Sequence, residues 1–299
     1  MNYFKIYADF LKKFLQVKRP LFVVLDAFNG ASGIVATEIF SDYPLIQLIC
    51  LNNLPDGDFP AHGPNPLLAG ALKELCQKVV KQKADLGIAL DADGDRALFV
   101  DNLGRSVPAY VIACLIFQNR RPPFVVDEPL FKILQQLKVI DLKNIILSRV
   151  GYAFIRAVMR QSNSSSTAEY SGHYCFEETF QADSALFTLI QVLNNLSAQK
   201  QTLAEFYDSL PPFTVDMENF KFKEETDWLA IRKKFVGYFS GKAKEIAERD
   251  GLTFDFGESW LNVRLSNNEP LLRFTAGAKT PNIVARLLKE CGQIALQIR

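Results

Sequence analysis

Short, continuous apolar runs alternate along the chain with segments of helical periodicity, and this alternation constrains the fold more than any other feature. The first run, Leu21–Leu25, leads into a glycine-rich turn and then a helical segment, which is the opening of a β-α unit. Further runs of strand length occur at Ile46–Leu51, Leu86–Leu90, Ala97–Val100 and Phe124–Val126. The pattern predicts an α/β fold with mixed sheets for most of the chain.

The C-terminal part has a different sequence pattern, because charged and apolar residues alternate at shorter intervals. Its periodicity predicts a long helix over Asp227–Asp250 and a C-terminal helix over Ile283–Gln297. Between them, paired strands are predicted at Leu252–Phe256, Trp260–Leu265 and Leu271–Ala276. This combination of segregated helices and strands is typical of an α+β domain.

Two proline pairs, Pro122-Pro123 and Pro211-Pro212, are predicted to mark domain boundaries. They divide the chain into an N-terminal helix and three domains, over residues 1–19, 20–121, 122–211 and 212–299. We expect two three-layer α/β domains followed by a smaller α+β domain. The only low-complexity patch, Ser162–Ser166, is predicted to form a mobile loop.

Composition excludes several classes of protein. The 34 basic and 33 acidic residues give a net charge of +1, which argues against a dedicated nucleic-acid binder. No apolar run approaches the roughly 18–20 residues that a membrane span needs. The five cysteines are scattered and never form a C-x-x-C pair, which predicts reduced thiols and a cytoplasmic location. With only two histidines, a multi-histidine metal site is almost excluded.

Three carboxylates stand within five residues at Asp91, Asp93 and Asp95, followed at once by Arg96. They repel one another unless a cation lies among them, and their alternate spacing directs them into one concavity. An EF-hand does not fit, because the glycine is misplaced, Asn102 stands where a glutamate should close the loop, and strands flank it. A Mg²⁺ site open to a phosphate oxygen fits better. The alternative is a solvated acidic turn.

A second polar segment contains Glu169, Ser171 and His173 around a glycine. Each sugar hydroxyl both donates and accepts a hydrogen bond, and these three side chains supply both roles. The alternative is a polar turn whose histidine bonds to the backbone.

A third segment begins at Arg264 and includes Ser266, Asn267 and Arg273 around a predicted tight turn. Two guanidiniums, a hydroxyl and the two amides of Asn267 and Asn268 suit a phosphate group, although a hairpin with solvated arginines would look the same. His62, in a loop rich in proline and glycine, is predicted to be a loop-packing residue, with a ligand role as the alternative.

In this order, the three segments resemble the alpha-D-phosphohexomutase family, which includes phosphomannomutase and phosphoglucomutase. The family's loops have the forms D-G-D-G-D-R, G-E-x-S-G-H and R-x-S-N-T-E-P, and here they read D-A-D-G-D-R, A-E-Y-S-G-H and R-L-S-N-N-E-P. The segments Asp26–Gly33 and Asp56–Pro60 also resemble parts of the family's second domain. The resemblance covers the chain from Arg19 to the C-terminus.

The resemblance implies an isomerase that moves phosphate between the 1- and 6-positions of glucose or mannose, through a phosphoserine and with Mg²⁺. Asp91, Asp93 and Asp95 would hold the metal, and Arg96 would act catalytically by steadying the phosphoryl group. The sugar would be held by Glu169, Ser171 and His173, and the non-reacting phosphate by Arg264, Ser266, Asn267 and Arg273.

The chain also departs from the family pattern. It contains no T-A-S-H-N-P serine loop, Ala92 and Ala168 replace glycines, Arg149–Tyr152 replaces a K-x-G-H turn, and Glu128 stands near an expected lysine. We therefore expect a mutase-type protein that lacks the phosphoserine domain and would act only if a separate chain supplied it. The alternative is a non-catalytic hexose-phosphate-binding protein or a truncated gene product.

Overall fold

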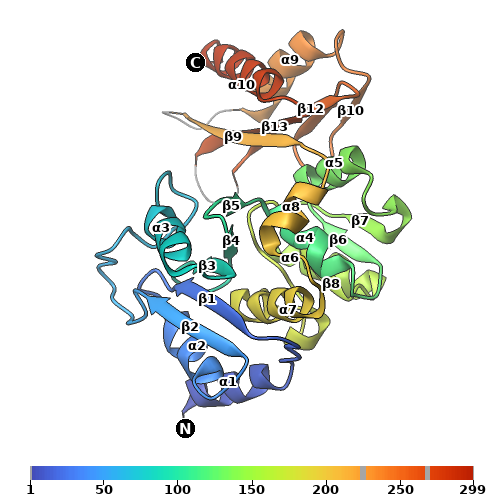
Figure 1. The fold of residues 1–299 in the computed structure, drawn as a ribbon. Coiled ribbons are helices and arrows are strands. Elements are labelled where there is room, and N and C mark those ends of the chain that lie inside the picture. Colours follow the sequence, from blue (N-terminus) through green and yellow to red (C-terminus); the bar gives the residue numbers. More distant parts are fainter. Residues whose placement is uncertain (1, 223–226, 267–269, 299) are drawn as a thin grey trace. The chain divides into compact units, whose positions relative to one another are not determined.

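The computed structural model describes residues 2–222, 227–266 and 270–298 (Figure 1). The chain folds into two compact units, each built from two stretches of sequence. Unit 1 contains Met1–Val125 and Met159–Leu210, and unit 2 contains Val126–Val158 and Pro211–Arg299. The division into four parts at the proline pairs stays a prediction.

The elements alternate between helices and strands along most of the chain. The helices are α1 (Tyr3–Lys12), α2 (Ser32–Phe40), α3 (Lys73–Gln82), α4 (Ala109–Phe117), α5 (Glu128–Leu137), α6 (Tyr152–Ser162), α7 (Ala185–Ala198), α8 (Leu203–Ser209), α9 (Trp228–Phe239) and α10 (Pro281–Leu296), with short 3₁₀ turns η1 (Leu142–Asn144) and η2 (Glu177–Thr179). The strands are β1 (Leu21–Asp26), β2 (Ile46–Leu51), β3 (Leu86–Leu90), β4 (Ala97–Asp101), β5 (Ser106–Val107), β6 (Phe124–Val126), β7 (Ile145–Leu147), β8 (Ser166–Ala168), β9 (Thr214–Lys221), β10 (Glu245–Ala247), β11 (Leu252–Asp255), β12 (Ser259–Leu265) and β13 (Leu271–Ala278). None of the described helices is long and apolar enough to cross a membrane.

Unit 1 is organised around a five-stranded sheet of order β2-β1-β3-β4-β5. Strand β1 runs parallel to β2 and β3, whereas β3 pairs with β4 and β4 pairs with β5 in the antiparallel direction. Every residue of β3 is buried, which explains why this strand is a continuous apolar run in the sequence. The predicted α/β class with a mixed sheet is confirmed.

Unit 2 contains a five-stranded antiparallel sheet of order β10-β11-β12-β13-β9. Helices α9 and α10 supply apolar side chains to the same core as this sheet, among them Phe235, Phe239 and Leu288. The predicted α+β character of the C-terminal part is confirmed. A third, three-stranded sheet has the order β7-β6-β8.

Two sequence predictions about secondary structure are wrong. The helix predicted over Asp227–Asp250 ends at Phe239, because Gly241 follows soon after and Glu245–Ala247 pair with β11 as an edge strand. The predicted mobile loop at Ser162–Ser166 instead runs from the end of α6 into β8, and Ser164, Ser165 and Ser166 are buried.

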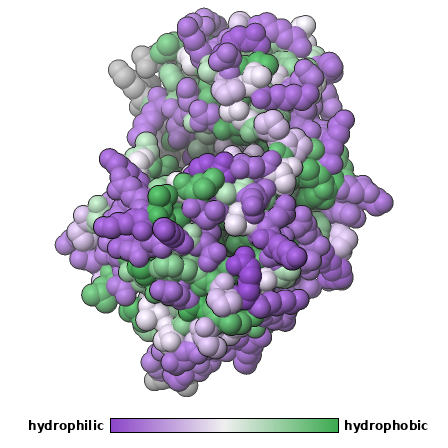
Figure 2. Space-filling model, in the orientation of Figure 1, coloured by the Kyte–Doolittle hydropathy of each residue, from purple (hydrophilic) through white to green (hydrophobic). Residues whose placement is uncertain are grey.

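On the face drawn in Figure 2 the surface is mostly hydrophilic.

A buried ion pair joins α5 to β11 within unit 2. Lys132 Nζ lies 2.8 Å from Asp255 Oδ2, and the Lys132 side chain is only 6% exposed. We expect Lys132→Met to lower the free energy of unfolding of this unit by about 3 kcal/mol, because it leaves a carboxylate without its partner. Urea denaturation measures this loss. The double variant Lys132→Met/Asp255→Asn removes both charges and should recover at least about half of it; an equal or larger loss would contradict this explanation.

Candidate active site

The three carboxylates of the predicted metal loop come together in unit 1. The loop joins β3 to β4, whose antiparallel pairing runs up to Leu90 opposite Ala97 and so fixes both ends of the loop. One carboxylate oxygen from each of Asp91, Asp93 and Asp95 lies within 4.8 Å of the other two. Asp91 is buried, Asp95 is half-buried and Asp93 is exposed, so the group opens toward solvent at one side.

The donor set suits a divalent cation. Asp91 Oδ2 and Asp95 Oδ1 are both buried and accept no hydrogen bond from the described residues. The nitrogen atoms beside them are Arg96 Nε, at 2.7 Å from Asp91 and 3.7 Å from Asp95, and His173 Nε2, at 3.4 Å from Asp95. Carboxylate oxygens are the ligands that Mg²⁺ prefers, and three of them leave coordination positions for water or phosphate. The residues present therefore fit this metal.

The pKa values of the loop show how strongly its charges interact. Burial and the neighbouring Asp95 carboxylate raise the pKa of Asp91 to about 7. Burial would also raise the pKa of Asp95, but the adjacent His173 and Asp91 side chains outweigh burial and lower that pKa to about 2. A bound cation would favour the ionised form of both carboxylates.

The loop turns sharply at Gly94, which has a φ of +78°. A Cβ at this position would also collide with Ser32 Oγ. Ala92, in contrast, is not among the described residues with a positive φ, and Ala168 lies in β8. The two alanines that replace family glycines therefore cause no backbone strain.

We expect Gly94→Ala to lower the free energy of unfolding by about 2 kcal/mol or more, because it combines a left-handed backbone with a steric clash. Thermal denaturation followed by circular dichroism measures the effect. Gly57→Ala is the matched control, since no atom lies within 4 Å of its added Cβ. Equal melting temperatures for the two variants would contradict the assigned backbone strain.

The predicted sugar loop lies directly against the metal loop. Its turn is closed by hydrogen bonds from Gly172 N to Glu169 O (3.0 Å) and from Glu169 N to His173 O (2.9 Å). Ala97 N then donates to Gly172 O at 3.0 Å, and Arg96 and His173 form a β-bridge. Sequence positions more than seventy residues apart are therefore held together by the backbone.

His173 connects the two loops through its side chain. Its Nδ1 lies 2.8 Å from Ser171 Oγ, and its Nε2 lies 3.4 Å from Asp95 Oδ1. Burial would lower the pKa of His173, but Asp95 and Glu169 outweigh burial and raise it. Glu169 is buried at 6% exposure. The predicted sugar-binding side chains are thus gathered in one place, beside the carboxylates.

Asp183 joins this site although sequence reasoning missed it. One of its carboxylate oxygens lies within 4.8 Å of ligand atoms of Asp95 and His173. A β-bridge between Asp183 and Cys175 brings it back toward the sugar loop. Burial, followed by the charge of Asp95, raises the pKa of Asp183. No local motif marks this residue, because its position near the site depends on the path of the chain between the sugar loop and α7.

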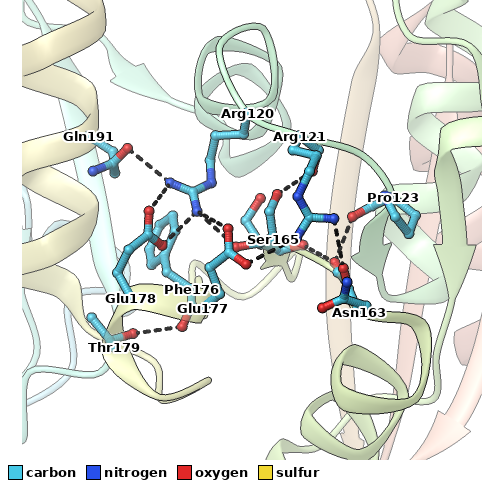
Figure 3. Close-up of polar contacts among 12 residues, drawn as sticks. Arg120, Arg121, Pro123, Asn163, Ser165, Phe176, Glu177, Glu178, Thr179 and Gln191 are labelled. Carbon is cyan, nitrogen blue, oxygen red and sulfur yellow. Dashed lines mark hydrogen bonds and ion pairs between the residues drawn. The ribbon is translucent and has the colours of Figure 1, made fainter.

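The segment after the sugar loop is fixed by two neighbouring arginines in the turn that follows α4 (Figure 3). Arg120 binds Glu178 through both carboxylate oxygens, at 2.7 and 3.1 Å, and donates to Ser165 O at 2.9 Å. Its guanidinium also lies 5.1 Å from the centre of the Phe176 ring. Arg121 contacts Glu177 at 3.0 Å. The polypeptide that follows His173 is therefore held at several points.

The predicted phosphate loop belongs to unit 2. Arg264 on β12 and Arg273 on β13 are direct cross-strand partners, which places them on the same face of the sheet. Arg264 Nε lies 4.0 Å from Asp250 Oδ2, and Arg273 Nε donates to Asn219 Oδ1 at 3.0 Å. Two like charges opposite each other favour an anion between them.

The turn between these strands closes with a hydrogen bond from Ser266 N to Leu271 O at 2.9 Å. Asn267 lies outside the described residues.

Two positions of unit 2 depart from the family pattern, at Glu128 and at Arg149. Glu128 is buried at 1% exposure, and burial raises the pKa of its carboxyl, although the positive charges of Arg249 and Lys132 act to lower it. The Arg149 guanidinium packs over the Phe154 ring at 4.6 Å.

Family models match almost the whole chain. Profiles for three domains of phosphoglucomutase/phosphomannomutase match in order: alpha/beta/alpha domain II over residues 5–104, alpha/beta/alpha domain III over residues 132–213, and the C-terminal domain over residues 217–291. The chain belongs to the phosphoglucomutase/phosphomannomutase family.

Individual relatives support the same family assignment. The chain is 29% identical to a phosphomannomutase from Escherichia coli, over 91% of this chain and 62% of that protein. It is 32% identical to a phosphohexose mutase from Xanthomonas campestris, over 85% of this chain and 58% of that protein. A phosphoglucomutase/phosphomannomutase family protein from Burkholderia thailandensis shares the fold, with a TM-score of 0.83, 23% identity, and coverage of 97% of this chain and 63% of that one. The chain thus spans about 60% of the length of these relatives.

Proposed function

We propose that this chain carries the metal, sugar and phosphate sites of a phosphohexomutase that interconverts hexose 1-phosphate and hexose 6-phosphate, with glucose or mannose as the sugar. The observation that carries the proposal is the group formed by Asp91, Asp93 and Asp95, whose carboxylates lie within 4.8 Å of one another beside Arg96 and the sugar loop. Family membership supports the same reaction class.

Within this proposal, Asp91, Asp93 and Asp95 hold Mg²⁺, which when bound neutralises charge on the transferring phosphoryl group. Arg96 is already oriented, because its Nε pairs with Asp91 at 2.7 Å and its Nη1 lies 3.4 Å from Asn65 Oδ1. An arginine fixed in this way spends little conformational entropy when it binds the phosphoryl group.

Recognition of the sugar falls to Glu169, Ser171 and His173, which offer acceptors and donors from one turn. The non-reacting phosphate is assigned to Arg264, Ser266, Asn267 and Arg273. In this assignment, separate groups of side chains bind Mg²⁺ and orient the substrate.

The serine that carries the phosphoryl group is proposed to come from a separate polypeptide. Helix α1 offers a surface for such a partner, since Tyr3, Phe4 and Ile6 are 72%, 48% and 52% exposed on a helix whose other face is buried through Ala8 and Leu11. The five free cysteines favour a cytoplasmic setting for the pair.

Calorimetry tests the recognition part of the proposal. Glucose 1-phosphate and mannose 1-phosphate are titrated into the chain with Mg²⁺, and at least one should bind saturably. Arg273→Gln should weaken that binding about tenfold, because it removes a charge-assisted contact to phosphate. Lys289→Gln, at an exposed position of α10, is the control. No saturable binding of either sugar phosphate would refute the proposal, whereas binding that never leads to conversion would favour a non-catalytic hexose-phosphate-binding protein.

A further inference from the structure

A second buried polar cluster lies in unit 1, centred on Asp26 at the end of β1. Asp26 is completely buried and accepts three hydrogen bonds: from Phe28 N at 3.1 Å, from Asn52 Nδ2 at 3.0 Å, and from His62 Nε2 at 2.9 Å. Because a carboxylate only accepts hydrogen bonds, the last contact places a proton on His62 Nε2. The His62 ring also packs on Phe28, with 3.8 Å between the ring centres.

This contact joins two loops that are far apart in sequence. The first loop, residues 27–31, follows β1 and contains Phe28 and Asn29 at positive φ, which are costly conformations for residues other than glycine. The second loop, residues 55–66, carries His62. Asp56 N donates to Asn29 O at 2.9 Å, so the loops are also joined by backbone.

Each of the two loops forms a backbone hydrogen bond with the metal loop. Ala92, which stands between Asp91 and Asp93, donates through its N to Pro64 O at 3.3 Å, and its O accepts from Ala31 N at 3.4 Å. Both backbone groups of Ala92 are thus bonded to the loops that Asp26 and His62 connect. Gly30 lies so close to Ala92 that a Cβ on Gly30 would collide with the Ala92 carbonyl.

We propose that the Asp26–His62 pair is a positioning element for the carboxylate loop, which it holds in its metal-binding geometry through the two loops that it connects. Its consequence for metal affinity rests on the proposed function. The pair is linked to the metal loop through the backbone hydrogen bonds of Ala31 and Pro64 with Ala92. A stiff support of this kind raises affinity because the carboxylates need not be ordered when the cation binds.

Hydrogen exchange and metal binding test this role together. In Asp26→Asn and His62→Ala, the amides of Ala92 and Ala31 should exchange at least about tenfold faster, and the dissociation constant for Mn²⁺, measured by electron paramagnetic resonance, should rise about tenfold or more. His62→Gln keeps a donor that reaches Asp26, so it should stay within about threefold of the wild type in both measurements.

Asp101→Asn is the matched control. Asp101 is also completely buried in unit 1 and accepts three hydrogen bonds, but it lies at the opposite end of the β3–β4 pair. It should change neither quantity at temperatures where the protein is folded.

Unchanged exchange at Ala92 and unchanged Mn²⁺ affinity in a folded His62→Ala or Asp26→Asn protein would overturn the inference, as would an equal effect of Asp101→Asn. A wild-type chain that binds no Mn²⁺ would refute the proposed metal site instead. In that case the exchange rates alone would decide whether the pair positions the loop.

Discussion

Asp93→Asn is expected to weaken Mn²⁺ binding by at least about 100-fold while leaving the folded protein as stable as before or slightly more so. Loss of a residue that only supports a metal ligand costs about 10–100-fold in affinity, so loss of a ligand should cost at least as much. Stability should not fall, because Asp93 is exposed and its removal relieves repulsion from Asp91 and Asp95. Electron paramagnetic resonance measures free Mn²⁺, and thermal denaturation without metal measures stability.

Asp42→Asn is the control for this variant, since it removes an exposed acid from the same unit without touching the loop. It should leave Mn²⁺ affinity within about twofold. If Asp93→Asn bound Mn²⁺ as tightly as Asp42→Asn, the three carboxylates would be a solvated acidic turn.

Arg120→Met is expected to lower the free energy of unfolding by about 3 kcal/mol, whereas Arg121→Met should cost less than about 1 kcal/mol. The two residues are neighbours and each pairs with a glutamate of the same turn (Figure 3). Their environments differ, because the Arg120 side chain is 8% exposed and that of Arg121 is 51% exposed. Removing the buried cation leaves Glu178 and the Ser165 carbonyl without their donor.

Equilibrium unfolding in urea gives both values, and an unchanged slope of the transition shows that the denatured state is the same. Similar losses for the two variants would mean that burial does not set the strength of these ion pairs. A loss in Arg120→Met together with weaker binding of hexose phosphate would also show that the support of the sugar loop matters for recognition.

The features that the sequence predicts well are those encoded locally. The apolar runs of β1, β2, β3 and β4 and the loop of Asp91, Asp93 and Asp95 are each contained within a few residues. The order of three polar segments was enough to indicate the family. His62 was predicted to be a loop-packing residue, and its contact with the Phe28 ring confirms this.

Features that depend on distant parts of the chain were not predictable. The charged residues after Phe239 favour a helix by propensity, but Glu245–Ala247 gain more from pairing with β11. The serines at 164–166 look solvent-exposed by composition, yet Ser164 Oγ donates to Pro123 O at 2.7 Å inside the protein. Asp183 reaches the site through a bridge to Cys175, and no periodicity records such a contact.

We propose that these residues hold the Mg²⁺ and substrate sites of a hexose-phosphate mutase. The most direct test is ³¹P nuclear magnetic resonance of glucose 1-phosphate or mannose 1-phosphate with Mg²⁺ and a trace of hexose 1,6-bisphosphate. The chain is mixed with the part of its Escherichia coli relative that it does not match, which the family resemblance implies to carry the serine. A 6-phosphate resonance is expected to appear only when both polypeptides are present and to be lost in Asp93→Asn. No conversion at any ratio of the two polypeptides would contradict it.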